Sequence, residues 1–243
     1  LMEYLKAKGI VCKISNYKES DKILTLLTYE KGKIQFVAKG VKKKGAALAH
    51  AARLFYCGNF EFICSNNIPI LTGASQIQDF FGLTHKMETL YYASHFMNLC
   101  SYFIQEEQPS HDLMSLLLNS LYLLMREEAD PMLLTAIIQF RIASLEGSAP
   151  ITDFCVECNK PLDDNCSFCF SIDNDGISCC NDGTCISHAI FKAINHICNA
   201  DASKIYFFNI PKADLPVLYE LSCRYIEKIA GKHFEILDWI KEL

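Results

Sequence analysis

The sequence predicts a two-domain α+β protein, with a small N-terminal β-barrel followed by an α-helical domain that contains a metal-binding insertion. Three observations support this. Positive charge is confined to the first quarter of the chain, the hydrophobic period changes near residue 80, and cysteines gather between Cys155 and Cys185. With 243 residues, 51% of them hydrophobic, the chain is long enough for two packed domains. We place the barrel at 1–80 and the helical domain at 81–243, with the insertion at about 151–186.

The first 80 residues contain five segments with the composition or alternation of β-strands. These segments are 9–14, 23–28, 33–39, 60–64 and 70–77. Tyr29-Glu30-Lys31-Gly32 has the turn chemistry to reverse the chain after the second segment, and Asn66-Asn67 separates the last two. Five short strands with a long connection between the third and the fourth fit a small closed barrel.

After about residue 85 the apolar residues follow helical spacing. The expected helices are 90–104, 113–125, 131–146, 187–198 and 213–230, with a short one near the C-terminus. Asp130-Pro131 is typical of a helix start, because Asp caps free amides and Pro suits the first turn. Gly147 suits the end of the same helix.

The distribution of charge points to a polyanionic partner. Residues 1–53 contain 12 Lys or Arg and 4 Asp or Glu, whereas the remainder contains 11 and 24. The net charge of −5 therefore hides a basic module, for which nucleic acid is the commonest partner. No apolar run reaches the roughly 18 residues of a membrane span, and the N-terminus lacks the apolar core of a signal peptide. We expect a cytoplasmic protein that does not bind membranes.

The lysine run after the third strand is the main candidate for phosphate contacts. Lys39, Lys42, Lys43 and Lys44 surround Gly40 and precede Gly45, so that flexible cations lie on a loop that can turn sharply. Further candidates on the barrel are Lys13, Lys33 and Arg53. Aromatic side chains that could stack on bases are Tyr17, Phe36, Phe55 and Tyr56, although their alternating neighbours favour a core position for most of them. The alternative for the lysine run is an ordinary solvated loop.

Seven of the thirteen cysteines lie between Cys155 and Cys185, which indicates a metal site in a chain whose thiols stay reduced. Cys155 and Cys158 have the spacing of a zinc knuckle, and Cys179 follows at a distance typical of a zinc ribbon. The predicted ligand set is Cys155, Cys158, Cys179 and Cys185, with Cys180 as the alternative fourth ligand. Cys166 and Cys169 form a second pair with two-residue spacing. The alternative is a reduced Cys-rich segment, or disulfides formed on isolation.

We expect this zinc to be structural rather than catalytic. Four sulfurs would close the coordination shell, whereas catalytic zinc keeps an open position. No His-Glu-x-x-His motif, phosphate-binding Gly-rich loop with Lys-Ser/Thr, or Gly-x-Ser-x-Gly elbow occurs. The sequence therefore predicts a protein that is not an enzyme.

Several stretches resemble the bacterial recombination mediator RecO family. At the N-terminus these are 9–11, 16–24, 28–33 and 38–42, and the last of them covers the first half of the lysine run. Cys155 and Cys158 match the first cysteine pair of the family, and residues 175–179 match its Gly-Gly-x-x-Cys step with Asp175 in place of the first Gly. The chain departs from the pattern at Asp182, where the family spacing has a cysteine, and at Gly45, where serine is usual.

The resemblance implies an N-terminal OB-fold, a helical domain with a four-cysteine zinc site, and a non-enzymatic role in DNA repair and recombination. Members of the family bind single- and double-stranded DNA and anneal complementary strands. With RecR they help to load RecA onto DNA coated by single-stranded-DNA-binding protein, whose acidic C-terminal tail is a further partner. The resemblance also implies a bacterial, nucleoid-associated location.

Two other functions remain open at this point. The first is a zinc-containing adaptor whose barrel binds a partner protein chain, which would lack salt-sensitive binding to unrelated oligonucleotides. The second is a zinc-dependent nucleic-acid enzyme, which would need an open metal site and turnover.

Overall fold

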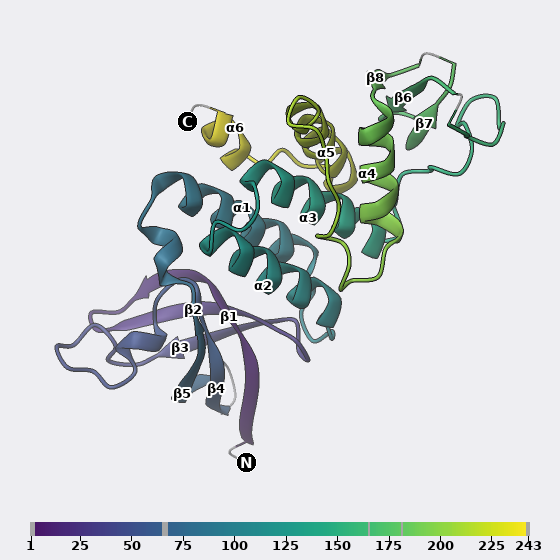
Figure 1. Ribbon diagram of the computed structural model, residues 1–243. Coiled ribbons are helices and arrows are strands. Elements are labelled where there is room, and N and C mark those ends of the chain that lie inside the picture. The colour runs from purple at the N-terminus through teal and green to yellow at the C-terminus, as the bar shows by residue number, and fades with distance from the viewer. Residues whose placement is uncertain (1–2, 65–67, 165, 181, 242–243) are drawn as a thin grey trace. The chain divides into compact units, whose positions relative to one another are not determined.

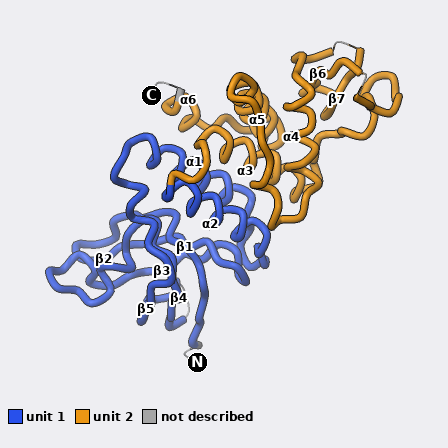
Figure 2. The backbone as a smooth tube through the Cα atoms, viewed as in Figure 1, with its two compact units in different colours: residues 1–126 blue, residues 127–243 orange. Residues whose placement is uncertain are grey.

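The computed structural model describes residues 3–64, 68–164, 166–180 and 182–241, so the turn expected at Asn66-Asn67 lies outside the described residues. The chain forms two compact units, residues 1–126 and residues 127–243, which we call the first and the second unit (Figure 2). Strands give way to helices near residue 80, the boundary expected from the sequence. The first unit nevertheless continues to residue 126, because it also includes the two helices that follow. None of the helices in the described part of the chain is long and apolar enough to span a membrane.

Five strands of the first unit form a closed barrel in the order β1-β2-β3-β5-β4 (Figure 1). They are β1 (Glu3–Tyr17), β2 (Asp21–Thr28), β3 (Lys33–Ala38), β4 (Tyr56–Cys64) and β5 (Ile70–Asp79). All five expected strands are present, and β1 and β4 begin earlier than the sequence pattern indicated. The N-terminal half of β1 pairs with β4 and its C-terminal half with β2, so one long strand belongs to both sides of the barrel.

The seam between β3 and β5 is the weakest part of the barrel ladder. These strands are parallel and pair only at Val37 and Ile70 among the described residues. One further hydrogen bond supports the seam, from the Val37 N–H to the Pro69 carbonyl at 2.8 Å. The short helix η1 (Ala49–Ala51), which lies in the connection from β3 to β4, contacts β5.

Alternating side chains of the strands fill the barrel. Phe36 on β3 lies between Phe60 and Phe62 of β4, with ring centroids 5.9 and 5.0 Å apart, and all three rings are fully buried. The period-two alternation of β-strands places Phe60 and Phe62 on the same face. Val41, in the middle of the lysine loop, is buried in the same core and anchors the loop to the barrel.

Helices α1 (Met87–Phe103) and α2 (His111–Met125) follow the barrel after the short helix η2 (Phe81–Thr84). The connection between α1 and α2 is hydrogen-bonded to the β2–β3 turn. The Ser110 N–H donates to the Tyr29 carbonyl at 2.8 Å, and the Lys33 N–H donates to the Gln105 carbonyl at 3.3 Å. This docking explains why the first unit extends past the barrel to residue 126.

We expect substitution of Gly32 to destabilise this docking. Gly32 has a φ of +58°, and a Cβ atom there would collide with the backbone carbonyl of Gln105. Gly32→Ala should lower the free energy of unfolding of the first unit by about 3 kcal/mol, from left-handed strain and the backbone clash together. The measurement is urea denaturation.

Gly45→Ala is the matched control for this change. Gly45 also has a positive φ of +76°, but no atom lies within 4 Å of the position of a Cβ atom. This control should therefore cost only about 1 kcal/mol. Equal losses for the two variants would contradict the proposed role of the Gly32 contact.

A buried histidine on α1 gives the first unit a pH dependence. His95 is fully buried, and burial lowers its pKa from 6.5 to about 3. The unfolded chain therefore takes up a proton near pH 6.5 while the folded chain does not, so stability is present above pH 6.5 and decreases as the pH falls. Between pH 7 and pH 5 this histidine should reduce the free energy of unfolding by about 2 kcal/mol.

The test is urea denaturation of wild type and His95→Gln at pH 7 and pH 5. The variant should lose less stability over this interval than the wild type, because its side chain does not titrate. An equal loss in both proteins would show that other groups cause the pH dependence.

The second unit is a helical core with a small sheet at one end of α4 (Figure 1). Its helices are α3 (Pro131–Leu145), α4 (His188–Asn199), α5 (Leu215–Ala230) and α6 (Ile236–Lys241). As expected, the Asp130 side chain caps α3 by accepting from the Met132 N–H at 2.8 Å, and Pro131 occupies the first turn. Helix α3 packs against α4 and α5, and Phe140 and Ile138 on it are fully buried.

The cysteine-rich segment forms a three-stranded sheet of order β7-β6-β8. The strands are β6 (Phe168–Ser171), β7 (Gly176–Ser178) and β8 (Thr184–Ile186). Lys228 on α5 holds the β6–β7 turn, because its ammonium donates to the Ile172 carbonyl at 2.6 Å and to the Asp175 carboxylate at 2.7 Å. Asp175 has a φ of +57°, a left-handed conformation that favours glycine.

Candidate metal centre and nucleic-acid interface

Four cysteine sulfurs converge in the second unit. They belong to Cys155, Cys158, Cys179 and Cys180, and all lie within 4.8 Å of one another. The Cys158 and Cys179 sulfurs are 3.5 Å apart, and those of Cys155 and Cys180 are 3.9 Å apart. Four sulfurs placed tetrahedrally about 2.3 Å from a zinc ion would be about 3.8 Å apart. The donor set and its spacing therefore fit one tetrahedral ion.

Two local structures bring these sulfurs together. Residues 155–159 form a tight turn, in which the Asn159 N–H donates to the Cys155 carbonyl at 3.0 Å. Cys179 and Cys180 follow β7, which is hydrogen-bonded to this turn by the Val156 N–H and the Ile177 carbonyl at 2.9 Å. The turn and the end of β7 thus each supply two of the four sulfurs.

Hydrogen bonds prepare Cys155 to carry negative charge. Its sulfur accepts the N–H groups of Cys158 at 3.5 Å and Cys179 at 3.3 Å. Burial raises the pKa of the Cys155 thiol, but these backbone donors outweigh it and lower that pKa to about 5. A thiolate with amide donors is the form in which cysteine binds a metal.

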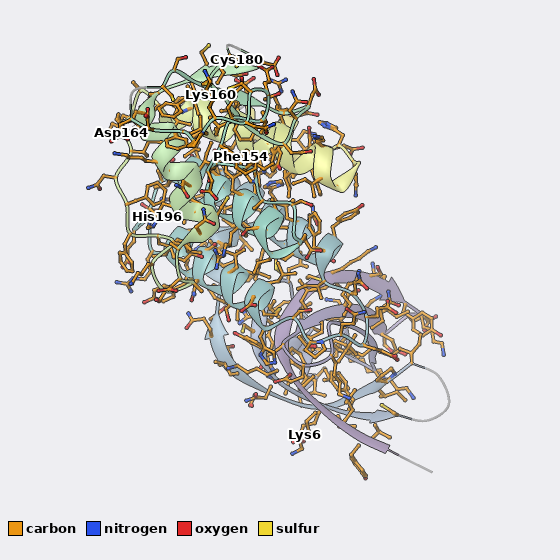
Figure 3. The ribbon with its side chains drawn as sticks, turned by 90° about the vertical axis from the view of Figure 1, so that its right-hand side faces the viewer. Lys6, Phe154, Lys160, Asp164, Cys180 and His196 are labelled. Atoms are coloured by element: carbon orange, nitrogen blue, oxygen red, sulfur yellow. The ribbon has the colours of Figure 1, made fainter. Side chains whose placement is uncertain are left out.

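The position of Cys180 is fixed by a polar chain. The Ser178 hydroxyl accepts the Cys180 N–H at 3.0 Å and donates to the Glu157 carboxylate at 3.2 Å. Cys180 itself is exposed, so the cluster lies at the surface of the second unit, where Figure 3 shows Cys180 and Lys160 at the same end.

The structure brings together three residues of the predicted ligand set and places the fourth elsewhere. Cys155, Cys158 and Cys179 are brought together as expected, but the fourth sulfur is that of Cys180 and not that of Cys185. Cys185 lies on β8 opposite Cys169 of β6, with the two sulfurs 2.7 Å apart. The reason is the strand order of the small sheet. Strand β6 lies between β7 and β8, so Cys185 on β8 is separated from the end of β7.

Two polar residues of the same region, Asp182 and His188, have structural partners outside the four-sulfur cluster. Asp182, which stands where the family pattern has cysteine, accepts hydrogen bonds from Ser171 at 2.7 Å and from Asn174 at 3.2 Å. His188 lies on α4, is 2.7 Å from the Asp164 carboxylate and stacks on Phe168. Neither belongs to the four-sulfur cluster.

The lysine loop lies at the end of β2 that is farther from the docked helices. The Asp21 carboxylate, at the start of β2, accepts the Gly40 N–H at 2.8 Å, and the Lys42 N–H donates to the Ser20 carbonyl at 3.0 Å. The hydrogen bond from Gly40 is the main reason why the pKa of Asp21 is lowered, and its carboxylate therefore stays ionised. These contacts hold the loop against the β1–β2 turn.

The cations of this loop are available to a ligand. Lys39, Lys42, Lys43 and Lys44 are all exposed. Within the described part of the chain, none of Lys42, Lys43 and Lys44 forms an ion pair. Lys18, which the sequence pattern did not single out, lies in the β1–β2 turn. Its positive charge, together with that of Lys39, helps to lower the pKa of Asp21. We call the surface formed by residues 17–20 and 39–45 the basic end of the barrel.

The three weaker candidates have different surroundings. Lys13 is exposed on β1 next to a register shift between Val11 and Lys13. The Lys33 ammonium donates to the Ser101 carbonyl at 3.1 Å, and Arg53 pairs with the Asp79 carboxylate at 3.1 Å. The structure therefore does not bring Lys33 to the basic end, and it engages Arg53 in an ion pair.

One of the four candidate aromatic residues is accessible at the basic end. Phe36, Phe55 and Tyr56 are buried, as their alternating neighbours indicated. Tyr17 is 38% exposed, and the Lys18 ammonium lies 5.2 Å from the centre of its ring. Tyr17 thus offers a ring face among cations.

The protein therefore belongs to a class in which one unit is a β-barrel with a basic end and the other is a helical unit with a four-sulfur cluster. Comparison of the sequence with known proteins places the chain more closely. It matches the sequence model described as "Recombination protein O N terminal" over residues 2–80 and that described as "Recombination protein O C terminal" over residues 84–235.

Curated relatives agree with this match. DNA repair protein RecO of Acetivibrio thermocellus is 31% identical over 253 residues, which cover 100% of this chain and 98% of the relative. DNA repair protein RecO of Caldicellulosiruptor saccharolyticus is 35% identical over 246 residues, with 99% of both chains covered. The chain belongs to the recombination protein O family, whose members act in DNA repair and recombination.

Proposed function

We propose that this protein is a non-enzymatic recombination mediator that binds single- and double-stranded DNA through its barrel and anneals complementary strands. The observation that carries the proposal is the basic end of the barrel, where Lys42, Lys43 and Lys44 are exposed on a loop anchored by Val41 and Asp21. Flexible cations on an anchored loop favour phosphate contacts, which are independent of sequence.

The barrel supports an OB-fold assignment for the proposed DNA-binding domain, residues 1–80. Its strand order β1-β2-β3-β5-β4 and the helix η1 between β3 and β4 agree with a five-stranded Greek-key barrel. The proposed contacts are Lys39, Lys42, Lys43 and Lys44, with Lys18 in the adjacent β1–β2 turn and Lys13 farther along β1 as a weaker candidate. We give Lys33 and Arg53 smaller roles, because each already has a partner within the first unit.

The experiment that tests DNA binding is a salt titration. Fluorescence anisotropy with unrelated single-stranded oligonucleotides should give affinities that fall linearly with the logarithm of salt concentration. A strand-annealing assay on the same samples tests the activity itself. Absence of salt-sensitive binding would reject the proposal and favour an adaptor whose barrel binds a protein chain.

The metal that we propose for the four-sulfur cluster is structural zinc. Four thiolates would fill a tetrahedral shell and leave no position for water or substrate. Metal analysis of the purified protein should give about one zinc ion per chain. The absorption spectrum of a cobalt-substituted sample should show four sulfur ligands. An open coordination position would favour the zinc-dependent nucleic-acid enzyme instead.

We further propose that the second unit serves protein partners. It contains 9 Lys or Arg and 18 Asp or Glu, which makes it a poor surface for DNA, whereas the first unit contains 14 and 10. By family membership the proposed partners are RecR and the C-terminal tail of single-stranded-DNA-binding protein, and the proposed outcome is RecA loading in the bacterial cytoplasm. Pull-down of RecR by the full chain tests this assignment, and failure to retain RecR would argue against it.

A further inference from the structure

A second pair of cysteines faces each other across the small sheet of the second unit. Cys169 on β6 and Cys185 on β8 are directly opposite in the antiparallel register. Their sulfurs are 2.7 Å apart, and both residues are free thiols. Directly opposite residues of antiparallel strands have Cα separations of about 4.5–5.5 Å, within the range that a disulfide bridges.

The geometry of this pair differs from that of the four-sulfur cluster. Two thiolates bound to the same zinc ion would be about 3.8 Å apart. The 2.7 Å separation of Cys169 and Cys185 is much closer to a sulfur–sulfur bond of about 2.05 Å. Neither residue belongs to the four-sulfur cluster. The pair is therefore arranged for a bond between the sulfurs and not for shared coordination.

We propose that Cys169 and Cys185 are a reversible oxidation site, which forms a cross-strand disulfide when the protein meets hydrogen peroxide. In the first step the Cys185 sulfur attacks peroxide, so that an S–O bond forms and the O–O bond breaks, and the hydroxide that leaves takes up the thiol proton and departs as water. In the second step the Cys169 sulfur attacks the sulfenic acid of Cys185, the S–S bond forms as the S–O bond breaks, and the leaving hydroxyl takes up the Cys169 proton to become a second water. Two thiols lose two electrons and two protons, and one peroxide becomes two waters.

The environments of the two sulfurs set the order of these steps. Cys185 is exposed and can meet the oxidant, whereas Cys169 is fully buried. Burial, followed by the hydrogen bond with Cys185, raises the pKa of the Cys169 thiol to about 11. Cys169 is therefore protonated and out of reach of the oxidant, and its reaction partner is the sulfenic acid formed on Cys185 beside it. This arrangement, an accessible cysteine beside a resolving one, is typical of redox-sensing sites.

The bond would also change the mechanics of the second unit. The segment closed by residues 169 and 185 contains Cys179 and Cys180, which are half of the four-sulfur cluster. The disulfide would also tie β8 to β6 at the centre of the sheet, and β8 leads directly into Ser187, the cap of α4. Oxidation should therefore restrict opening of the segment that presents these two ligands.

The test uses the full chain as purified and hydrogen peroxide as the oxidant. Thiol titration before and after treatment should show the loss of two thiols, and peptide mapping should place the new bond between residues 169 and 185. A thiol reductant should restore both thiols. A second readout is the rate of zinc release to a chelator, which should be lower in the oxidised protein.

Cys185→Ser is the variant that should abolish the crosslink, because it removes an exposed sulfur without opening a cavity. Cys166→Ser is the matched control, since Cys166 lies in the same segment with its sulfur 3.5 Å from the Asp163 carboxylate and should leave the crosslink intact. Both variants should have the circular dichroism spectrum of the wild type. If the variant at 185 misfolds, alkylation of wild-type Cys185 before treatment provides the same test.

Two outcomes would overturn the inference. One is a treated protein in which Cys169 and Cys185 remain thiols while cysteines of the four-sulfur cluster are oxidised. The other is the same loss of two thiols in wild type and in Cys185→Ser. Neither outcome depends on DNA binding, so the inference and the proposed function can fail separately.

Discussion

Replacement of Lys42, Lys43 and Lys44 by alanine should lower the affinity for single-stranded DNA by about 100-fold at 0.1 M salt. Each lost phosphate contact removes about 0.7–0.9 from the slope of log affinity against log salt, so three contacts account for about two decades. The slope itself should become flatter by about one to three units, depending on how many of the lysines bind phosphate. Anisotropy at four or more salt concentrations measures both quantities.

The control for this variant is a triple substitution with the same change of net charge. Lys6, Lys192 and Lys204 are suitable, because each lies within 4.0 Å of an acidic side chain and none belongs to the basic end of the barrel. Their replacement by alanine should leave the slope nearly unchanged. If the two triple variants behave alike, the effect comes from overall charge and not from the loop.

Cys180→Ser should disrupt zinc binding, whereas Cys185→Ser should preserve it. Structural zinc in small sites contributes roughly 10–16 kcal/mol of binding free energy, so the loss of one of four thiolates is expected to cost several kcal/mol. We expect less than one zinc per chain in Cys180→Ser and a melting temperature of the second unit lower by about 10 °C. Metal analysis and calorimetry provide the two measurements.

This comparison separates the two possible ligand sets. Both residues are exposed cysteines of the same segment, so the substitutions remove equivalent side chains from similar surroundings. Loss of zinc from Cys185→Ser with retention in Cys180→Ser would contradict the assignment of Cys180 as the fourth ligand.

Much of the fold could be predicted from local patterns. The alternation at Phe60 and Phe62 and the capping pair Asp130-Pro131 are signals that depend only on neighbouring residues, and both elements are present. Strand ends were less well predicted. Strand β1 begins at Glu3, because its first half pairs with β4, and pairing with a distant strand leaves no local pattern in β1.

The fourth sulfur of the cluster could not be selected from spacing. In sequence, Cys185 and Cys180 are both compatible with a zinc ribbon, and the choice depends on the register of three short strands. Strands β7 and β8 have three residues each, too few for alternation to be recognised. The adjacent pair Cys179-Cys180 can contribute two ligands because the chain leaves β7 at this point.

The roles of individual lysines also depend on tertiary contacts. Lys33 and Lys42 are indistinguishable as cations in sequence, but the Ser101 carbonyl of α1 accepts the ammonium of Lys33. Lys18 was missed because it lies 21 residues before Lys39, and only the hydrogen bond between Asp21 and Gly40 brings their segments together. The composition of the first 53 residues identified the basic module but not which cations remain available.

The seam between β3 and β5 has a consequence for local motion. Because Val37 and Ile70 form the only ladder pair there among the described residues, amides of β5 that face the seam should exchange with solvent faster than those that bond to β4. Opening at Val37 would detach β3 from β5 only, because β3 stays paired with β2 from Lys33 to Ala38, so β2, β3 and the lysine loop would move together relative to β5. The barrel would then act as a hinge, so that lysines on a firmly anchored loop could follow strands of different curvature.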